Sequence, residues 1–100
     1  MELLNEKVQL WLDSARFVKA KPGVYILYDR KFNTIYIGES DNLQSLFSKY
    51  LDTDFDGNSC KQKTYTYQRM FTENHKEQKS ILLEQFKTKY GLLPCCNSES

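Results

Sequence analysis

Two tyrosines in neighbouring apolar runs are the residues of this sequence with the clearest chemical potential. Tyr25 lies in the run from Val24 to Tyr28, and Tyr36 lies in the run from Thr34 to Ile37. If the runs form antiparallel strands joined by a short polar turn, both phenols can project from one face. Glu84, on a helical segment facing them, would complete a set that could surround one divalent cation and its waters.

Hydrophobic spacing predicts the elements that would position these groups. Apolar residues recur at steps of three and four from Leu4 to Val18, which predicts a helix over residues 1–20 that ends before Pro22. The two β-rich runs then predict a hairpin, and Gly38 ends its second strand. The polar residues just after this glycine offer N-caps for a second helix, whose apolar stripe runs from Leu43 to Leu51.

The second half of the chain predicts one more strand and one more helix. A polar loop runs from Asp52 to Lys63, and the alternation from Thr64 to Phe71 indicates a third strand with two unlike faces. Asn74 and Glu77 have capping-box spacing before a helix that stops at Gly91. We therefore expect an α+β fold with a small three-stranded, mainly antiparallel sheet flanked by helices. It would form a single domain over residues 1–97, with a frayed tail at 98–100.

The charge balance and composition exclude several classes of protein. The chain of 100 residues has 14 Lys+Arg and 13 Asp+Glu, which gives a formal charge of +1 and no basic excess of the kind common in nucleic-acid-binding proteins. With 40% hydrophobic and 14% aromatic residues, the chain is expected to fold rather than to stay disordered. No run approaches the ~20 apolar residues of a membrane span, and the start lacks a signal-peptide pattern. We expect a cytoplasmic protein without membrane contact.

The three cysteines and the single histidine have ordinary expected roles. Cys60, Cys95 and Cys96 are odd in number and lack CxxC spacing, and the adjacent pair would bridge only with strain. The sequence favours free thiols over a metal site or a nucleophile. His75 has no Cys or Asp beside it, so we expect a solvated residue at a helix start.

Two tripeptides and three later features carry a resemblance to a known family. Gly23-Val24-Tyr25 and Tyr36-Ile37-Gly38, with ten residues between them, resemble the paired signature of the GIY-YIG nuclease superfamily. The polar helix start from Ser40 to Leu43, Glu84 in the last helix, and the Pro-x-x-Asn that ends at Asn97 resemble further parts of the pattern. The resemblance covers residues 21–97, and all five features occur in the expected order.

The resemblance implies hydrolysis of a phosphodiester bond. Glu84 would bind Mg²⁺ or another divalent cation, Tyr25 or Tyr36 would help to deprotonate the attacking water, and an arginine would hold the phosphate. Asn97 and Gly38 are carried over as a catalytic residue and a substrate-binding residue. A free phenol with a pKa near ~10 is a poor base at neutral pH, so this role requires positive charge nearby.

The sequence departs from the family at the arginine. Aligning Asn42-Leu43 with the pattern places Leu46 at that position, and leucine cannot donate to a phosphate. By analogy with a deleted oxyanion donor, the loss would slow hydrolysis by ~10²-fold to 10³-fold. Arg69 on the third strand is the better replacement, because its planar guanidinium can donate two hydrogen bonds to one phosphate. Lys49 is the other candidate. Glu39, where the resemblance implies a basic or polar residue, would repel phosphate.

Each candidate residue also has a structural alternative that the sequence leaves open. Tyr25 and Tyr36 could be core aromatics, and Glu84 could be a solvated helix residue. Asn97 could cap the end of the chain, Gly38 could only end a strand, and an edge-strand arginine could pair with a carboxylate.

A second motif competes in the polar loop. The stretch from Asp52 to Gly57 matches the start of an EF-hand calcium loop, and it follows a predicted helix. The twelfth position should be a glutamate but is Lys63, and a strand pattern follows in place of an exit helix. The sequence favours a solvated acidic loop and leaves weak Ca²⁺ binding open.

These patterns together predict a GIY-YIG endonuclease-like domain with impaired or absent metal-dependent hydrolysis, retained for binding or processing DNA or another nucleic acid. Tyr25, Tyr65 or Tyr67 would offer stacking surfaces. The expected phosphate contacts are six lysines: Lys61, Lys63, Lys76, Lys79, Lys87 and Lys89. The alternative is a protein-interaction module that uses the fold without nucleic acid, which the near-neutral charge and Leu46 would suit. The sequence does not set the oligomeric state.

Overall fold

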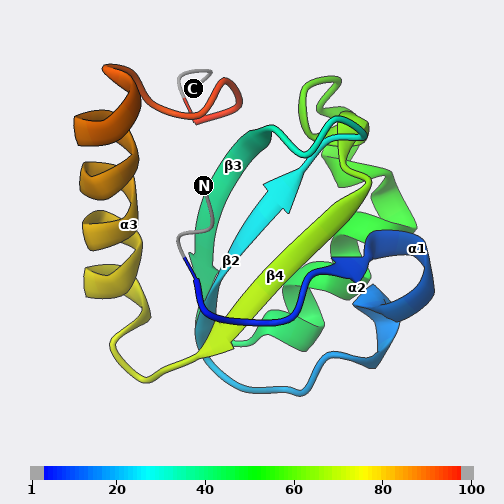
Figure 1. Ribbon diagram of the computed structural model, residues 1–100. Helices are drawn as coiled ribbons and strands as arrows, with labels where there is room; N and C mark the ends of the chain where they lie inside the picture. Colours follow the sequence, from blue (N-terminus) through cyan, green and yellow to red (C-terminus); the bar gives the residue numbers. More distant parts are fainter. Residues whose placement is uncertain (1–3, 98–100) are drawn as a thin grey trace.

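A four-stranded antiparallel sheet forms the centre of the computed structural model, which describes residues 4–97 (Figure 1). The spatial order of the strands is β1-β4-β2-β3. Their bounds are Gln9–Leu10 for β1, Gly23–Tyr28 for β2, Thr34–Ser40 for β3 and Thr66–Phe71 for β4. The α+β class is confirmed, whereas the predicted count of three strands misses the two-residue β1.

Strand β2 is the centre of the sheet and is buried along its whole length. Its uniformly apolar sequence fits this place, because a strand covered on both faces needs no alternation of polar residues. It pairs with β3 in a hairpin register that sets Tyr25 opposite Gly38 and Leu27 opposite Tyr36. The prediction that Gly38 ends the second strand is wrong, since β3 continues to Ser40.

Helices cover both faces of the sheet, as Figure 1 shows with α2 and α3 on opposite sides. The helix α3, His75–Tyr90, packs Leu82 and Phe86 against one face. The helix α2, Leu43–Thr53, buries its own apolar stripe against the other face. Among residues 4–97, no helix is both long and apolar enough to cross a bilayer.

The helix boundaries are set by their caps. Asn42 Oδ1 accepts a hydrogen bond of 3.0 Å from the Ser45 amide, which confirms the predicted polar start of α2. Gly91 adopts the left-handed conformation (φ 81°) and ends α3 as predicted. The predicted capping box at the start of α3 is wrong, because the Asn74 side chain makes no capping bond.

The N-terminal segment is not the helix predicted over residues 1–20. It contains β1, then the single-turn helix α1, Trp11–Ser14, and the 3-10 helix η1, Ala15–Phe17. Leu4 packs on the α3 side of the sheet, whereas Trp11 packs on the α2 side, so one helix could not bury both. The first three residues and the tail expected at 98–100 lie outside the described residues.

Replacing Asn42 with alanine removes the side-chain cap of α2. We expect Asn42→Ala to lower the free energy of unfolding by about 1 kcal/mol, and Asn42→Asp to retain most of it because the acceptor remains. Urea denaturation followed by circular dichroism measures both. Equal losses in the two variants would show that the cap does not stabilise this helix.

Candidate active site

Three phenols from three elements meet on the α2 side of the sheet. Tyr25 comes from β2, Tyr36 from β3 and Tyr50 from α2, and the Tyr25 and Tyr50 hydroxyls share a hydrogen bond of 2.9 Å. The rings of Tyr25 and Tyr36 lie 6.0 Å apart between centroids, which confirms that they share a face. Sequence reasoning missed Tyr50 because it counted this residue only as part of an apolar helix stripe.

Gly38 makes the close approach of these rings sterically feasible. A Cβ atom at this position would lie 2.4 Å from Tyr25 Cζ and 2.7 Å from Tyr36 Cε2, far inside van der Waals contact. Gly38 is itself buried, and its lack of a side chain leaves the space that the two tyrosine rings occupy. Its predicted contact with substrate stays a prediction.

Lys61 brings a positive charge to the phenol cluster. It begins the 3-10 helix η3, Lys61–Lys63, and its Nζ donates a hydrogen bond of 3.2 Å to the Tyr50 hydroxyl. The same ammonium lies 4.0 Å from the centroid of the Tyr36 ring. Partial burial lowers the pKa of Lys61, the nearby charge of Lys79 lowers it further, and Asp56 opposes both effects.

In the part of the chain that the structure describes, neither Arg69 nor Lys49, the two cations that the sequence favoured, contacts the phenols. Arg69 lies opposite Tyr25 in the β2–β4 register, but its guanidinium carbon sits 4.8 Å from the Phe71 ring centroid. Its Nε is buried without a hydrogen-bond partner among residues 4–97, so the expected carboxylate pair is not seen at that atom either. The exposed Lys49 ammonium lies 3.8 Å from Asp56.

Leu46 packs as part of the apolar stripe of α2, as the sequence predicted. It is half-buried and packs against the apolar cluster on the α2 side of the sheet. The position that the resemblance assigns to an arginine therefore belongs to the packing of α2, and the cation beside the phenols comes from a different segment.

The phenols keep their protons at neutral pH. Burial raises the pKa of Tyr25 well above its ordinary value, and the neighbouring Tyr50 and Tyr36 raise it further. Burial is also the main cause that raises the pKa of Tyr36 and of Tyr50. Positive charge therefore does not bring a phenol into the range of a neutral-pH base, as the predicted role would require, and these groups act as hydrogen-bonding hydroxyls.

The helix that carries Glu84 does not face the tyrosines, which corrects the sequence prediction. Glu84 is exposed on α3, the helix that packs on the opposite face of the sheet. Asn97 binds the main chain of Ile37 twice: its Oδ1 accepts from the amide at 2.8 Å, and its Nδ2 donates to the carbonyl at 2.9 Å. Asn97 thus fastens the edge strand β3 at the residue between Tyr36 and Gly38.

The negative charge expected to repel phosphate has a partner. Glu39 Oε2 contacts His75 Nδ1, so the carboxylate at the end of β3 is joined to the first residue of α3. The expectation of a merely solvated His75 is therefore wrong. The contact links the two elements that carry Tyr36 and Glu84.

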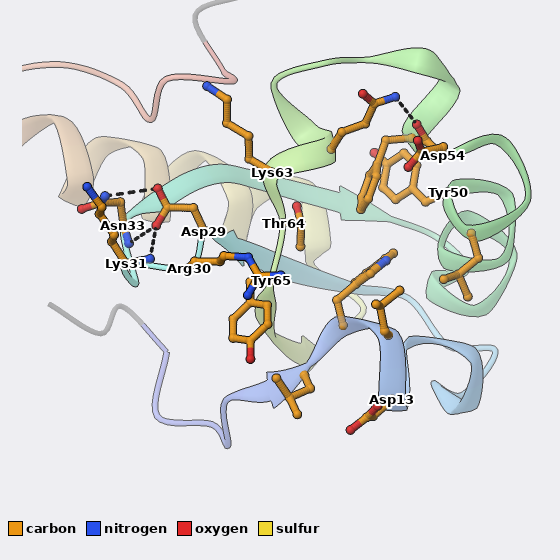
Figure 2. Close-up of a pocket in the computed structure, with 16 residues that line it drawn as sticks. Asp13, Asp29, Arg30, Lys31, Asn33, Tyr50, Asp54, Lys63, Thr64 and Tyr65 are labelled. Atoms are coloured by element: carbon orange, nitrogen blue, oxygen red, sulfur yellow. Dashed lines mark hydrogen bonds between the residues drawn. The ribbon is translucent and has the colours of Figure 1, made fainter.

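A groove of about 880 Å³ lies next to the phenol cluster and shares Tyr50 with it. Figure 2 shows its wall of Lys63, Thr64 and Tyr65 near the turn that carries Arg30. The Arg30 guanidinium carbon lies 4.6 Å from the centroid of the Tyr65 ring. The groove therefore offers an aromatic ring and cations beside the candidate site, together with several carboxylates.

The acidic loop does not continue as an EF-hand. The 3-10 helix η2, Phe55–Gly57, and then η3 follow α2, and β4 takes the place of an exit helix. Asp56 contacts Thr53 and Lys49, and Phe55 is buried in the core. These contacts give the loop a structural role.

The cysteines differ from the sequence prediction of three free thiols. Cys60 and Cys96 form a disulfide, because the fold brings the start of η3 next to the C-terminal turn. Cys95 lies outside this disulfide and is exposed. Nothing in the spacing of these residues along the chain indicated this proximity.

Several curated proteins that resemble this chain share one name, UvrABC system protein C. No family model matches the sequence. The chain is 26% identical over 81 residues to UvrABC system protein C of Rickettsia bellii, covering 76% of the chain and 13% of that protein. It is 29% identical over 90 residues to the Vibrio cholerae protein, covering 81% and 15%. The chain thus spans only about a seventh of these relatives.

Solved structures give the fold. The GIY-YIG N-terminal endonuclease domain of UvrC from Thermotoga maritima, bound to magnesium, matches with a TM-score of 0.63 and 22% identity, over 86% of this chain and 93% of that one. A variant of the same domain with an asparagine replaced by alanine matches with a TM-score of 0.62 and 20% identity, over 86% and 92%. The chain has the GIY-YIG fold.

A methyl group at Gly38 should disrupt the phenol cluster. We expect Gly38→Ala to lower the free energy of unfolding by about 1–3 kcal/mol, because neither tyrosine ring can move away without disturbing the core. It should also change the near-ultraviolet circular dichroism of the tyrosines. Gly57→Ala is the control for the spectrum: no atom lies within 4 Å of the added methyl group, so the spectrum should stay unchanged, although the positive φ of Gly57 (72°) should make this variant less stable as well. A wild-type spectrum for Gly38→Ala would contradict the steric argument.

The raised pKa of Tyr25 makes stability depend on pH above the ordinary tyrosine value of 10.0. The unfolded chain releases this proton first, so the stabilisation is complete below pH 10 and falls as the pH rises towards the native pKa. We expect the free energy of unfolding of Tyr25→Phe to fall less steeply above pH 10 than that of the wild type. Tyr90→Phe, at an exposed tyrosine, should follow the wild type. Parallel curves for wild type and Tyr25→Phe would refute the assignment.

Proposed function

We propose that this GIY-YIG domain binds nucleic acid and catalyses metal-dependent phosphodiester hydrolysis at a reduced rate, with Lys61 in the role of the missing arginine. The observation that carries the proposal is the Lys61 ammonium, which lies on the phenol cluster at 3.2 Å from the Tyr50 hydroxyl and 4.0 Å from the Tyr36 ring centroid. A phosphate held beside Tyr36 would meet this charge.

The spacing of two tyrosines along the chain supports the assignment of Tyr36 and Tyr50 to the site. Structures of the Thermotoga maritima domain include two variants, each with one tyrosine replaced by phenylalanine, and the two positions are fourteen residues apart in that chain. Tyr36 and Tyr50 are also fourteen residues apart here. Tyr50 thus joins Tyr25 and Tyr36 as a proposed site residue.

Each phenol has a different part in the proposed reaction. Tyr36 is half-buried and is the phenol that substrate can reach, whereas Tyr25 is only 1% exposed and Tyr50 is 5% exposed. Lys61 donates to the Tyr50 oxygen, and Tyr50 shares a hydrogen bond with Tyr25, so the ammonium is linked to the cluster by hydrogen bonds. The protonated Tyr36 hydroxyl would orient the attacking water or a phosphate oxygen.

Glu84 is the residue that would hold a divalent cation. Mg²⁺ is commonly bound through one or two carboxylates, with water and substrate phosphates filling its other positions. Glu84 is exposed on α3, which packs on the opposite face of the sheet from the phenols, so the proposal places the cation at the β3 edge, where Lys79 of α3 acts on the charge of Lys61. Glu39 already contacts His75. When bound, the cation would polarise the phosphate and stabilise the leaving oxygen. The magnesium-bound structure of the Thermotoga maritima domain supports this part of the proposal.

The groove beside the cluster suits a nucleic-acid strand. Tyr65 offers a ring for a base to stack on, and Arg30 and Lys63 offer contacts to phosphates. The groove is lined by three cations, Arg30, Lys31 and Lys63, and by three carboxylates, Asp13, Asp29 and Asp54, so contacts to phosphate depend on the individual cations and not on a net positive charge. A cytoplasmic setting, where nucleic acid is accessible, belongs to the same proposal.

A protein partner is the second candidate function. Leu12 and Phe17 are both 75% exposed on the N-terminal segment, and Leu10 is 43% exposed. Exposed apolar side chains gathered on one segment are typical of a protein-interaction surface. This alternative requires neither Lys61 nor Glu84.

A plasmid-nicking assay with Mg²⁺ tests the proposed chemistry. We expect slow nicking by the wild type, loss of nicking in Glu84→Ala, and a loss of ~10²-fold to 10³-fold in Lys61→Met, because a charge that stabilises the phosphoryl transition state is removed. Leu46→Arg should increase the rate if the added guanidinium reaches the phosphate. Lys19→Met is the matched control, since Lys19 is an exposed lysine outside the site.

Two results would contradict the proposal. If Lys61→Met nicks the plasmid as fast as Lys19→Met, Lys61 does not replace the arginine. If the wild type shows no nicking and no binding to nucleic acid at low salt, the protein-interaction alternative stands in its place.

A further inference from the structure

Three cysteine sulfurs meet where η3 approaches the C-terminal turn. Cys95 Sγ lies 3.9 Å from Cys60 Sγ and 4.0 Å from Cys96 Sγ, and all three sulfurs lie within 4.8 Å of one another. Cys60 and Cys96 are buried, whereas Cys95 is exposed. Nothing in the nuclease site uses these side chains.

The position of Cys95 does not favour disulfide exchange. A thiolate attacks a disulfide along the axis of the S–S bond, whereas Cys95 Sγ is nearly equidistant from both bonded sulfurs and so lies beside that bond. A bond between Cys95 and Cys96 would also need consecutive Cα atoms, about 3.8 Å apart, in a crosslink that usually spans about 4.4–6.8 Å. The three sulfurs form a triangle instead.

This triangle fits the coordination of a thiophilic cation. Zinc–sulfur bonds are about 2.3 Å long, so tetrahedral geometry separates neighbouring sulfur ligands by about 3.8 Å. Cys95 already lies at this separation from the other two sulfurs. We propose that Cys60, Cys95 and Cys96, once the Cys60–Cys96 bond is reduced, bind one cation of the zinc class as three thiolates, with water in the fourth position.

The chemistry of the step balances with a dithiol as reductant. The Cys60–Cys96 bond takes up two electrons and two protons, the dithiol closes to its own disulfide, and two thiols result. The cation then displaces the three thiol protons as it binds. All three ligands are soft sulfur donors, which select zinc-class cations over Mg²⁺ or Ca²⁺.

The surroundings suit the charge of such a complex. Three thiolates and one dication leave a net charge of −1, and Lys61 follows Cys60 directly in the chain. Lys79 lies close enough for its charge to act on Lys61. The exposure of Cys95 gives the cation a path from solvent, and water can occupy the open position on that side.

A bound cation would replace the disulfide as the link between two parts of the candidate site. Cys60 precedes Lys61, and Cys96 precedes Asn97, which fastens β3 beside Tyr36. The disulfide in the oxidised chain and the cation in the reduced chain would both hold these residues near the phenols. The cation site itself does not depend on the proposed nuclease function.

Cobalt titration tests the site without any activity assay. The full chain is reduced with dithiothreitol, freed of the reductant under anaerobic conditions, and titrated with Co²⁺. We expect one Co²⁺ per chain, thiolate-to-cobalt charge-transfer absorption with the visible bands of tetrahedral coordination, and displacement of Co²⁺ by Zn²⁺. Cys95→Ser should lose these bands, whereas Ser59→Ala, at the exposed neighbour of Cys60, should retain them.

The Cys95→Ser variant can be checked for folding in its oxidised form, because it keeps the Cys60–Cys96 disulfide. The proposal is overturned if the reduced wild type shows no charge-transfer bands, or if Cys95→Ser binds Co²⁺ as the wild type does. If no cation binds and mass spectrometry of the re-oxidised chain finds Cys95 bonded to Cys60, the three sulfurs form an exchange site instead.

Discussion

The close packing of Tyr25 over Gly38 is the contact on which the candidate site depends. Gly38 lies opposite Tyr25 in the hairpin, and the space that a side chain would fill there is occupied by the end of the Tyr25 ring. The ring thereby reaches Tyr50 on α2 and lies beside Tyr36 on β3. One missing side chain thus brings the central strand, the edge strand and a helix to a single group of hydroxyls.

In the proposed reaction, the positive charge beside the phenols comes from η3 and not from α2. Leu46 contributes to the core, and the Lys61 ammonium lies on the rings of Tyr36 and Tyr50. A lysine differs from an arginine, however, because it offers a compact charge where a guanidinium would offer a planar fork for two phosphate oxygens. Within the proposed function, a lysine in this place therefore favours weak hydrolysis over full activity.

Local patterns in the sequence predicted the parts of the fold that depend on local physics. The hairpin, the Asn42 cap and the Gly91 stop follow from turn, capping and left-handed preferences, and the structure has each of them. The prediction of an N-terminal helix is wrong because Leu4 and Trp11 pack on opposite faces of the sheet. The spacing of apolar residues along the chain cannot show on which face each one packs. The sequence named Lys61 only as one of six expected phosphate contacts. It could not show that Lys61 lies on the phenols or that Cys60 pairs with Cys96, because both contacts arise from how a long loop folds back.

The edge strand β3 shows how this small domain can hold its site without a larger core. An edge strand has main-chain groups on one side that no neighbouring strand satisfies. Asn97 supplies two of the missing bonds at Ile37, and the Cys96 amide donates to the Ile35 carbonyl at 2.8 Å. Because Cys96 is also joined to Cys60, the C-terminal turn and the Lys61 segment are fixed to the strand that carries Tyr36. The chemistry of the cysteines and the geometry of the phenols are therefore coupled through one short stretch of main chain.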